Sequence, residues 1–223
     1  MLTRVCLEEM EAGWIAHVVE LPGCFASHRD RDSALESVPV AIETYLAWCV
    51  AHGVRIRGVS GPIHISEMIR TWESEQGYEV NAFFATDQPA ILKRELPMFR
   101  DLLRATRQSL LAAVDGLQET EFTRRYEGER WSILEILAHV AGAEWWYLER
   151  VGMAFDRAEL PDDVLPRLGK VREYLIENLP RLASVTGVFS RTGEIWSARK
   201  VLRRALWHER DHTAHILQLR ARS

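Results

Sequence analysis

The sequence predicts an α+β protein in which a small sheet-and-helix unit precedes an all-α four-helix bundle. Short runs with alternating apolar residues fill the first part of the chain, and four long stretches with helical apolar spacing fill the rest. The charge changes between them: residues 1–87 carry six arginines, no lysine and thirteen acidic residues, a net charge of −7, whereas residues 88–223 carry +3. We therefore predict two domains, 1–87 and 88–223.

Alternating apolar residues predict the strands of the first unit. Runs 3–8 and 14–20 are rich in Val, Ile, Leu and Trp and form a hairpin, and run 25–28 adds a short strand. Two later stretches, 63–65 and 78–84, alternate in the same way. These strands are expected to form a sheet that one helix covers.

That helix is marked by its own start and stop signals. Ser33-x-x-Glu36 has the pattern of a capping box, so the helix is expected to start there. Pro39 is expected to kink its first turns, and Gly53 stands where a helix would stop. The apolar residues between them recur at three- and four-residue steps, which gives the helix one apolar face.

The second unit is predicted to begin after the polar run that ends at Pro89. Breaks short enough for antiparallel neighbours join its helical stretches, which is typical of a four-helix bundle. Pro97 suggests that the first stretch begins late or bends. The four stretches are residues 91–117, 131–151, 164–179 and 197–219.

Composition excludes several classes of protein. The 223 residues are 47% hydrophobic and 27% charged, which favours a globular protein over a disordered one. A net charge of −4 supplies no broad cationic field, so nucleic acid is not an expected partner. With no apolar stretch of membrane length and no secretory signal, we expect a cytoplasmic protein without membrane partners. Cys6, Cys24 and Cys49 are expected to be reduced, buried thiols.

Three histidines of the second unit form the candidate site. His208 and His212 are four residues apart, so on a helix they project from one face about one turn apart, which is a known metal-ligand spacing. His139 lies in an apolar stretch that is expected to face the bundle interior, where facing helices commonly assemble metal sites. The spacing alone favours core histidines that are satisfied by hydrogen bonds over metal ligands.

The segment WSILEILAHVAGAE at residues 131–144, followed by His208-x-x-x-His212, resembles the DinB-like metal-binding four-helix bundle. The resemblance covers residues 91–220. In that family one histidine of the second helix and two of the last bind a divalent metal, which implies that His139, His208 and His212 are the ligands. Many members continue as His-Arg-Gly-Gln, whereas this chain has His212-Thr213-Ala214-His215. This difference leaves the role of His215 open.

Several further residues are candidates for supporting this site. Glu135 is four residues before His139 and could orient its imidazole, and His215 could support the site or contact substrate. Glu144 and Glu209 could also carry protons, but their positions along the helices point them less directly at the imidazoles. An anionic substrate could be held by arginines of the last helix, although such residues are usually solvated: Arg203, Arg204 and Arg210.

The first unit resembles the HicB-like antitoxin domain. The resemblance covers residues 3–52 and depends on the turn LPGC at 21–24 and the segment AIETYL at 41–46. It implies a domain that binds a small RNA-cleaving toxin. The alternative is a module used for packing or for a homodimer, which is the commonest oligomer of soluble proteins.

Two functions follow from these observations. The first is an enzyme that depends on a divalent metal, with zinc or nickel as the expected ion, because three neutral nitrogen ligands leave positions for water or substrate. Members of the resembled family imply either transfer to a low-molecular-weight bacterial thiol or hydrolysis. The second is a protein-binding module of HicB type with a non-catalytic or sensing metal-binding bundle. The sequence assigns no catalytic residue beyond the three histidines.

Overall fold

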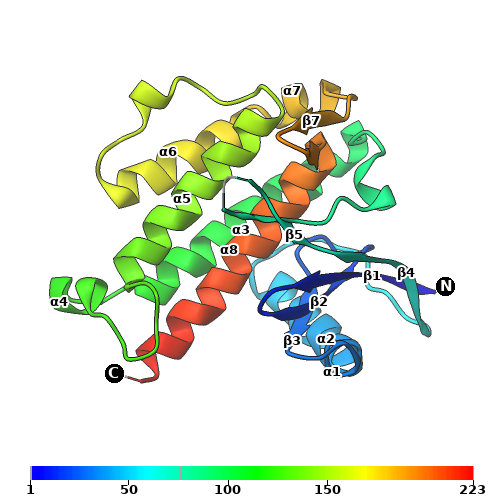
Figure 1. Cartoon of the computed structure of the whole chain (residues 1–223), viewed down its shortest axis with the longest axis horizontal. Coiled ribbons are helices and arrows are strands. Elements are labelled where there is room, and N and C mark those ends of the chain that lie inside the picture. Colours follow the sequence, from blue (N-terminus) through cyan, green and yellow to red (C-terminus); the bar gives the residue numbers. More distant parts are fainter. Residues whose placement is uncertain (1, 76, 223) are drawn as a thin grey trace.

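The computed structural model describes residues 2–75 and 77–222 and contains a sheet unit that lies against a helical bundle (Figure 1). The main sheet has the strand order β3-β2-β1-β4, in which β1 pairs antiparallel with β2 and parallel with β4. The strands are β1 (Thr3–Met10), β2 (Gly13–Val18), β3 (Phe25–His28) and β4 (Ile63–Arg70). The predicted hairpin and the short third strand are therefore confirmed.

Two helices replace the one that was predicted beside this sheet. They are α1 (Arg31–Glu36) and α2 (Val38–Ala51). The capping-box prediction at Ser33 is wrong, because Asp30 caps α1 by accepting a hydrogen bond from the Ser33 backbone nitrogen. Pro39 does not kink a helix, since it lies in the first turn of α2, where its missing N–H costs nothing. Gly53, with φ +67°, follows the end of α2 as expected.

The later strands also differ from the prediction. β4 forms at residues 63–70, but Ile63 and Ile65 are exposed, because the helices cover the other strands and leave this edge open. The stretch 78–84 supplies only a two-residue strand, β6 (Glu79–Val80), which pairs with β5 (Trp72–Glu73). Alternation over a few residues is thus not sufficient for a strand when no neighbour pairs with it.

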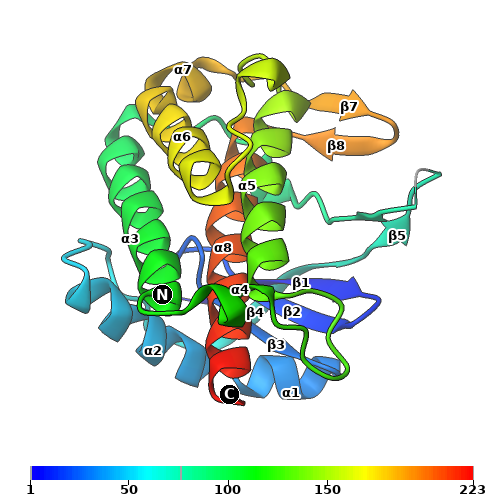
Figure 2. The same ribbon diagram turned by 90° about the vertical axis from the view of Figure 1, so that its left-hand side faces the viewer.

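Four long helices form the bundle at the predicted places. α8 packs against α3 and α5, and α6 packs against the same two helices, which closes the ring. Their bounds are α3 (Leu96–Val114), α5 (Ile133–Arg150), α6 (Val164–Glu177) and α8 (Ala198–Arg220). Shorter elements join them: α4 (Glu119–Thr123), α7 (Leu179–Ser184), and the hairpin of β7 (Phe189–Arg191) and β8 (Glu194–Trp196), which projects from the bundle in Figure 2. None of the helices among the described residues is both long and apolar enough to cross a membrane.

A ring of four buried charges joins the four helices. Each helix contributes one residue: Arg107 from α3, Glu144 from α5, Arg172 from α6 and Glu209 from α8. Arg172 lies 2.8 Å from Glu144 and 2.6 Å from Glu209, and Arg107 lies 3.0 Å from Glu144 and 2.5 Å from Glu209. Every charge therefore meets two of opposite sign, which offsets the cost of burying it.

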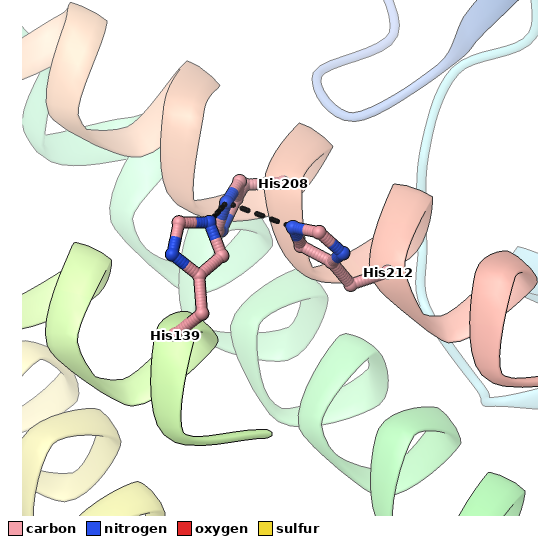
Figure 3. A group of neighbouring side chains, drawn as sticks. All are labelled: His139, His208 and His212. Atoms are coloured by element: carbon pink, nitrogen blue, oxygen red, sulfur yellow. Dashed lines mark hydrogen bonds between the residues drawn. The ribbon is translucent and has the colours of Figure 1, made fainter. Parts of the chain in front are cut away.

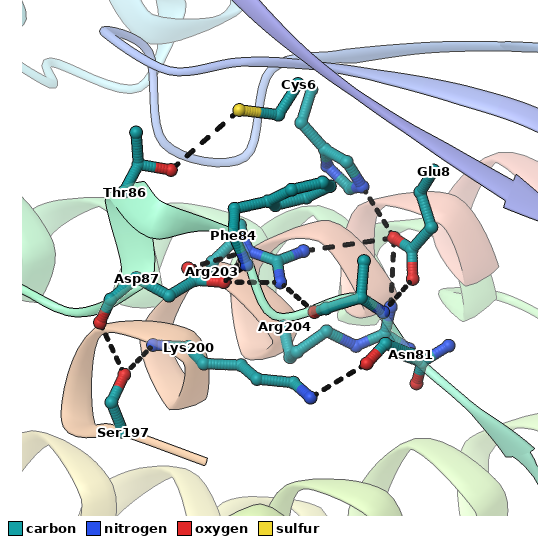
Figure 4. Close-up of polar contacts among 12 residues, drawn as sticks. Cys6, Glu8, Asn81, Phe84, Thr86, Asp87, Ser197, Lys200, Arg203 and Arg204 are labelled. Carbon is teal, nitrogen blue, oxygen red and sulfur yellow. Dashed lines mark hydrogen bonds and ion pairs between the residues drawn. The ribbon is translucent and has the colours of Figure 1, made fainter. Parts of the chain in front are cut away.

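The sheet unit and the bundle share one hydrophobic core. Val5, Leu7 and Tyr45 of the first unit belong to the same buried cluster as Phe99 and Leu206 of the bundle. Polar contacts reinforce this junction (Figure 4): Arg203 of α8 pairs with Asp87 at 2.8 Å and lies 3.9 Å from Glu8 of β1. The segment at the predicted domain boundary is therefore packed, and the division into 1–87 and 88–223 stays a prediction.

Candidate metal centre

Three imidazoles converge on one point between α5 and α8 (Figure 3). Nε2 of His208 lies 2.9 Å from Nε2 of His139 and 3.1 Å from Nε2 of His212. One ligand atom from each of the three residues lies within 4.8 Å of the other two. The one-turn spacing on α8 and the inward face of α5 thus place three nitrogens where one ion could meet them all.

Local sequence signals set the position of each histidine. The Ser132 hydroxyl caps α5 by accepting from the Glu135 backbone nitrogen, and the Glu135 carboxylate returns the bond to the Ser132 backbone nitrogen. This start places His139 two turns along the helix, facing α8. The Ser197 hydroxyl caps α8 in the same way by accepting from the Lys200 backbone nitrogen.

Burial keeps the three imidazoles neutral near pH 7. His208 is buried, whereas His139 and His212 are half-buried. Burial lowers the pKa of His139 and takes that of His208 well below its ordinary value, and it lowers the pKa of His212 to about 3. Positive charge at Arg204 acts on all three pKa values in the same direction. Neutral imidazole is the form that binds a metal.

The donor set fits a divalent cation. Tetrahedral coordination with N–metal distances of about 2.0–2.1 Å places the ligand nitrogens about 3.3 Å apart, only a few tenths of an ångström more than the separations seen here. A neutral imidazole carries one N–H, so three Nε2 atoms that face one another cannot all be satisfied by hydrogen bonds alone. Nδ1 of His212 is buried without a hydrogen-bond partner in the described part of the chain.

Aromatic rings enclose much of the site. The Trp131 ring lies 4.5 Å from the His139 ring and 6.2 Å from that of His212, between ring centroids. Tyr147 and Trp207 lie 6.0 and 5.9 Å from His208. Trp131 directly precedes Ser132, the cap of α5, and this position brings its ring over His139.

The two supporting candidates lie in different surroundings. The Glu135 carboxylate accepts hydrogen bonds from Ser132 and Arg125, so its contacts serve the start of α5 rather than an imidazole. His215 lies 3.0 Å from Glu129, and its ring centroid is 6.4 Å from that of His212. The structure thus brings His215 to the edge of the site, while its role stays a prediction.

Asp211 is a neighbour that sequence reasoning missed. It is half-buried on α8. Burial raises the pKa of its carboxyl group, although the charges of His215 and Arg204 act to lower that pKa. The sequence does indicate this position, because a residue three places after His208 on a helix lies near the same face. Glu144 and Glu209, which were considered as proton carriers, are instead held in the ring of charges within the bundle.

Comparison with known proteins gives one family and one structure. Among curated proteins no match is found. The solved structure of YfiT from Bacillus subtilis, described as a probable metal-dependent hydrolase with an unusual four-helix bundle topology, is 20% identical in sequence, with a TM-score of 0.46; the match covers 60% of this chain and 90% of that one. The family model of the DinB superfamily matches residues 102–216, which include all three histidines. The chain therefore belongs to the DinB superfamily.

Proposed function

We propose that this protein is a divalent-metal-dependent enzyme in which His139, His208 and His212 bind the ion. The observation that carries the proposal is the convergence of three Nε2 atoms within about one coordination sphere. Membership of the DinB superfamily supports it. Imidazole ligands suit zinc and nickel, which are the ions we expect.

The reaction class is hydrolysis or transfer to a thiol. A bound divalent ion would supply Lewis acidity and lower the pKa of a coordinated water or thiol. The protein supplies three neutral ligands, which preserve the charge of the ion and leave coordination positions for water or substrate. Trp131 and Tyr147 would restrict the access of solvent to the imidazoles.

Elemental analysis of untagged protein tests the metal site. We expect about one zinc or nickel ion per chain in the wild type and its loss in His139→Ala and in the double variant His208→Ala, His212→Ala. His64→Ala is the matched control, because this histidine is exposed on β4 and its removal should leave the metal content unchanged. Metal-free wild type that takes up no zinc or nickel on titration would overturn the proposal.

Activity assays on the metal-loaded protein then separate the two reactions. A panel of activated esters and amides tests hydrolysis, and a chromogenic aryl chloride offered with small thiols tests transfer. Activity that disappears with the metal in the histidine variants and remains in His64→Ala assigns the reaction to this site. No activity in either panel from fully loaded protein would contradict the proposed enzyme.

The partner-binding role of the first unit stays a prediction. The family match begins at residue 102, so residues 1–87 lie outside it. These residues share a hydrophobic core with the bundle, and Trp207 of α8 packs against the ring of His17. Any partner at this unit would therefore bind a surface that is joined to the metal-site helix.

A further inference from the structure

Arg204 is a buried cation beside the candidate metal centre. It precedes His208 by four residues on α8, so the two side chains leave the same face of the helix about 6 Å apart along its axis. Arg204 is only 4% exposed, and its guanidinium stacks over the Trp207 ring at 4.1 Å. Arg204, His208 and His212 therefore lie on one continuous face of α8.

This guanidinium has the Tyr147 side chain as a hydrogen-bond partner but leaves two of its nitrogens unpaired. Its Nε and Nη1 atoms are buried with no hydrogen-bond partner among the described residues. The Glu8 carboxylate lies 3.9 Å from Nη1, too far for a hydrogen bond, and already accepts from Nε2 of His17 and the backbone nitrogen of Ala82. Arg203, the adjacent residue, instead has Asp87 within 2.8 Å.

The surroundings of the three imidazoles are cationic. The Arg204 guanidinium leaves α8 one turn before His208, and the Arg130 guanidinium lies 4.9 Å from the centre of the Trp131 ring, which stacks on His139. A divalent ion would add two positive charges, so the loaded site would favour an anion.

We infer that Arg204 binds the carboxylate of the substrate, and that the substrate class is small carboxylates whose other end reaches the metal. A guanidinium donates strong hydrogen bonds to a carboxylate, and a substrate carboxylate could give one of the unpaired nitrogens the hydrogen bond that it lacks. Glu8 would then serve as a distant counter-ion that leaves these donors free. The inference depends on the metal site proposed above.

A series of mercaptocarboxylates provides the test. The protein is loaded with Co²⁺, and binding of each thiol is followed by its thiolate-to-cobalt absorption. The probes are mercaptoacetate, 3-mercaptopropionate and 4-mercaptobutyrate, with neutral 2-mercaptoethanol as reference and 2-mercaptoethylphosphonate to distinguish a phosphate-like end. We expect one of the mercaptocarboxylates to bind roughly tenfold to hundredfold more tightly than 2-mercaptoethanol.

Variants assign this preference to Arg204. Arg204→Met should remove the preference while 2-mercaptoethanol binds as before, and Arg204→Lys, which keeps the charge without the guanidinium, should retain part of it. Arg210→Met is the matched control, because Arg210 is stacked on Tyr45 and Trp48 of α2, away from the imidazoles. Cobalt content and thermal unfolding show that each variant is folded.

The outcomes separate this inference from the proposed function. Wild type that binds cobalt and 2-mercaptoethanol but shows no preference for a carboxylate would overturn the role of Arg204 alone. A preference that persists in Arg204→Met, or one for the phosphonate instead, would overturn it too. Wild type that binds no cobalt would overturn the metal site and this inference together.

Discussion

Glu8 shows how one buried carboxylate joins the sheet to the bundle. It is fully buried on β1, yet it accepts hydrogen bonds from His17 and from the backbone of Ala82. Burial alone would raise the pKa of Glu8, but the hydrogen bond from His17 and the charges of Arg204 and Arg203 lower it below its ordinary value. Burial also lowers the pKa of His17.

Acid should therefore weaken the fold through this pair. A carboxylate whose pKa is lower in the folded protein than in the unfolded chain stabilises the fold at pH values above its ordinary pKa, near 4.5. This stability is lost as the pH falls toward the pKa of the folded protein. His17 acts in the same direction below its ordinary pKa of 6.5, since the unfolded chain binds the proton more readily. Each proton that the unfolded chain binds in excess of the folded protein lowers the free energy of unfolding by about 1.4 kcal/mol per pH unit as the pH falls.

Urea unfolding between pH 7 and pH 4 measures this dependence. The free energy of unfolding of the wild type should fall with pH, and that of Glu8→Gln should fall less steeply below pH 5, because a titrating group is gone. Glu36→Gln, an exposed change in α1, should keep the wild-type slope. Equal slopes in wild type and Glu8→Gln would show that Glu8 has an ordinary pKa.

At this scale the sequence predicted that the three histidines come together but did not predict their surroundings. The i, i+4 spacing of His208 and His212 is a local property of a helix, and the apolar neighbours of His139 indicated a buried face. The contacts of Glu135 and Arg204 depend on side chains outside their own helices, which are Arg125 and Glu8. Helical phase alone does not reveal such partners.

At the scale of elements, the ring of Arg107, Glu144, Arg172 and Glu209 fixes how the four helices meet. Each member is nearly inaccessible, so the loss of one leaves others buried without a full set of opposite charges. Glu209 directly follows His208, one of the three proposed ligands. The ring therefore also sets the rotation of α8, and with it the direction of the imidazoles.

Removal of one charge from this ring should be costly. Arg172→Met should lower the free energy of unfolding by about 3–5 kcal/mol, because it leaves Glu144 and Glu209 undercompensated. Arg181→Met, on an exposed position of α7, should change it by less than about 0.5 kcal/mol. Denaturant titration of both variants gives the values. A loss below about 1 kcal/mol for Arg172→Met would show that the ring contributes little.

Long periodic elements were predictable and short ones were not. The four bundle helices match their predicted stretches to within a few residues, because twenty residues of apolar periodicity give a strong signal. The break at Ser37 and the hairpin of β7 and β8 were missed. Their few residues carry little periodic information, and tertiary neighbours decide their conformation.

The whole molecule should unfold as one unit. The shared core, the pair of Arg203 with Asp87 and the stacking of Arg210 on Trp48 all cross the predicted boundary at residue 87. We expect tryptophan fluorescence and far-UV circular dichroism to give coincident urea transitions. Residues 88–223 expressed alone should be markedly less stable than the full chain. Two separated transitions in the full chain would contradict this.

The position of α8 in the chain also affects the order of folding. Glu8 on β1 and Arg203 on α8 are 195 residues apart, and at about 5–20 residues per second their synthesis is separated by roughly 10–40 s. During that interval the bundle-facing side of the sheet, with its buried carboxylate, lacks the cover that α8 gives it in the folded protein. The nascent first unit is therefore a natural client for chaperones, and a mutation that slows the docking of α8 would prolong its exposure to proteases.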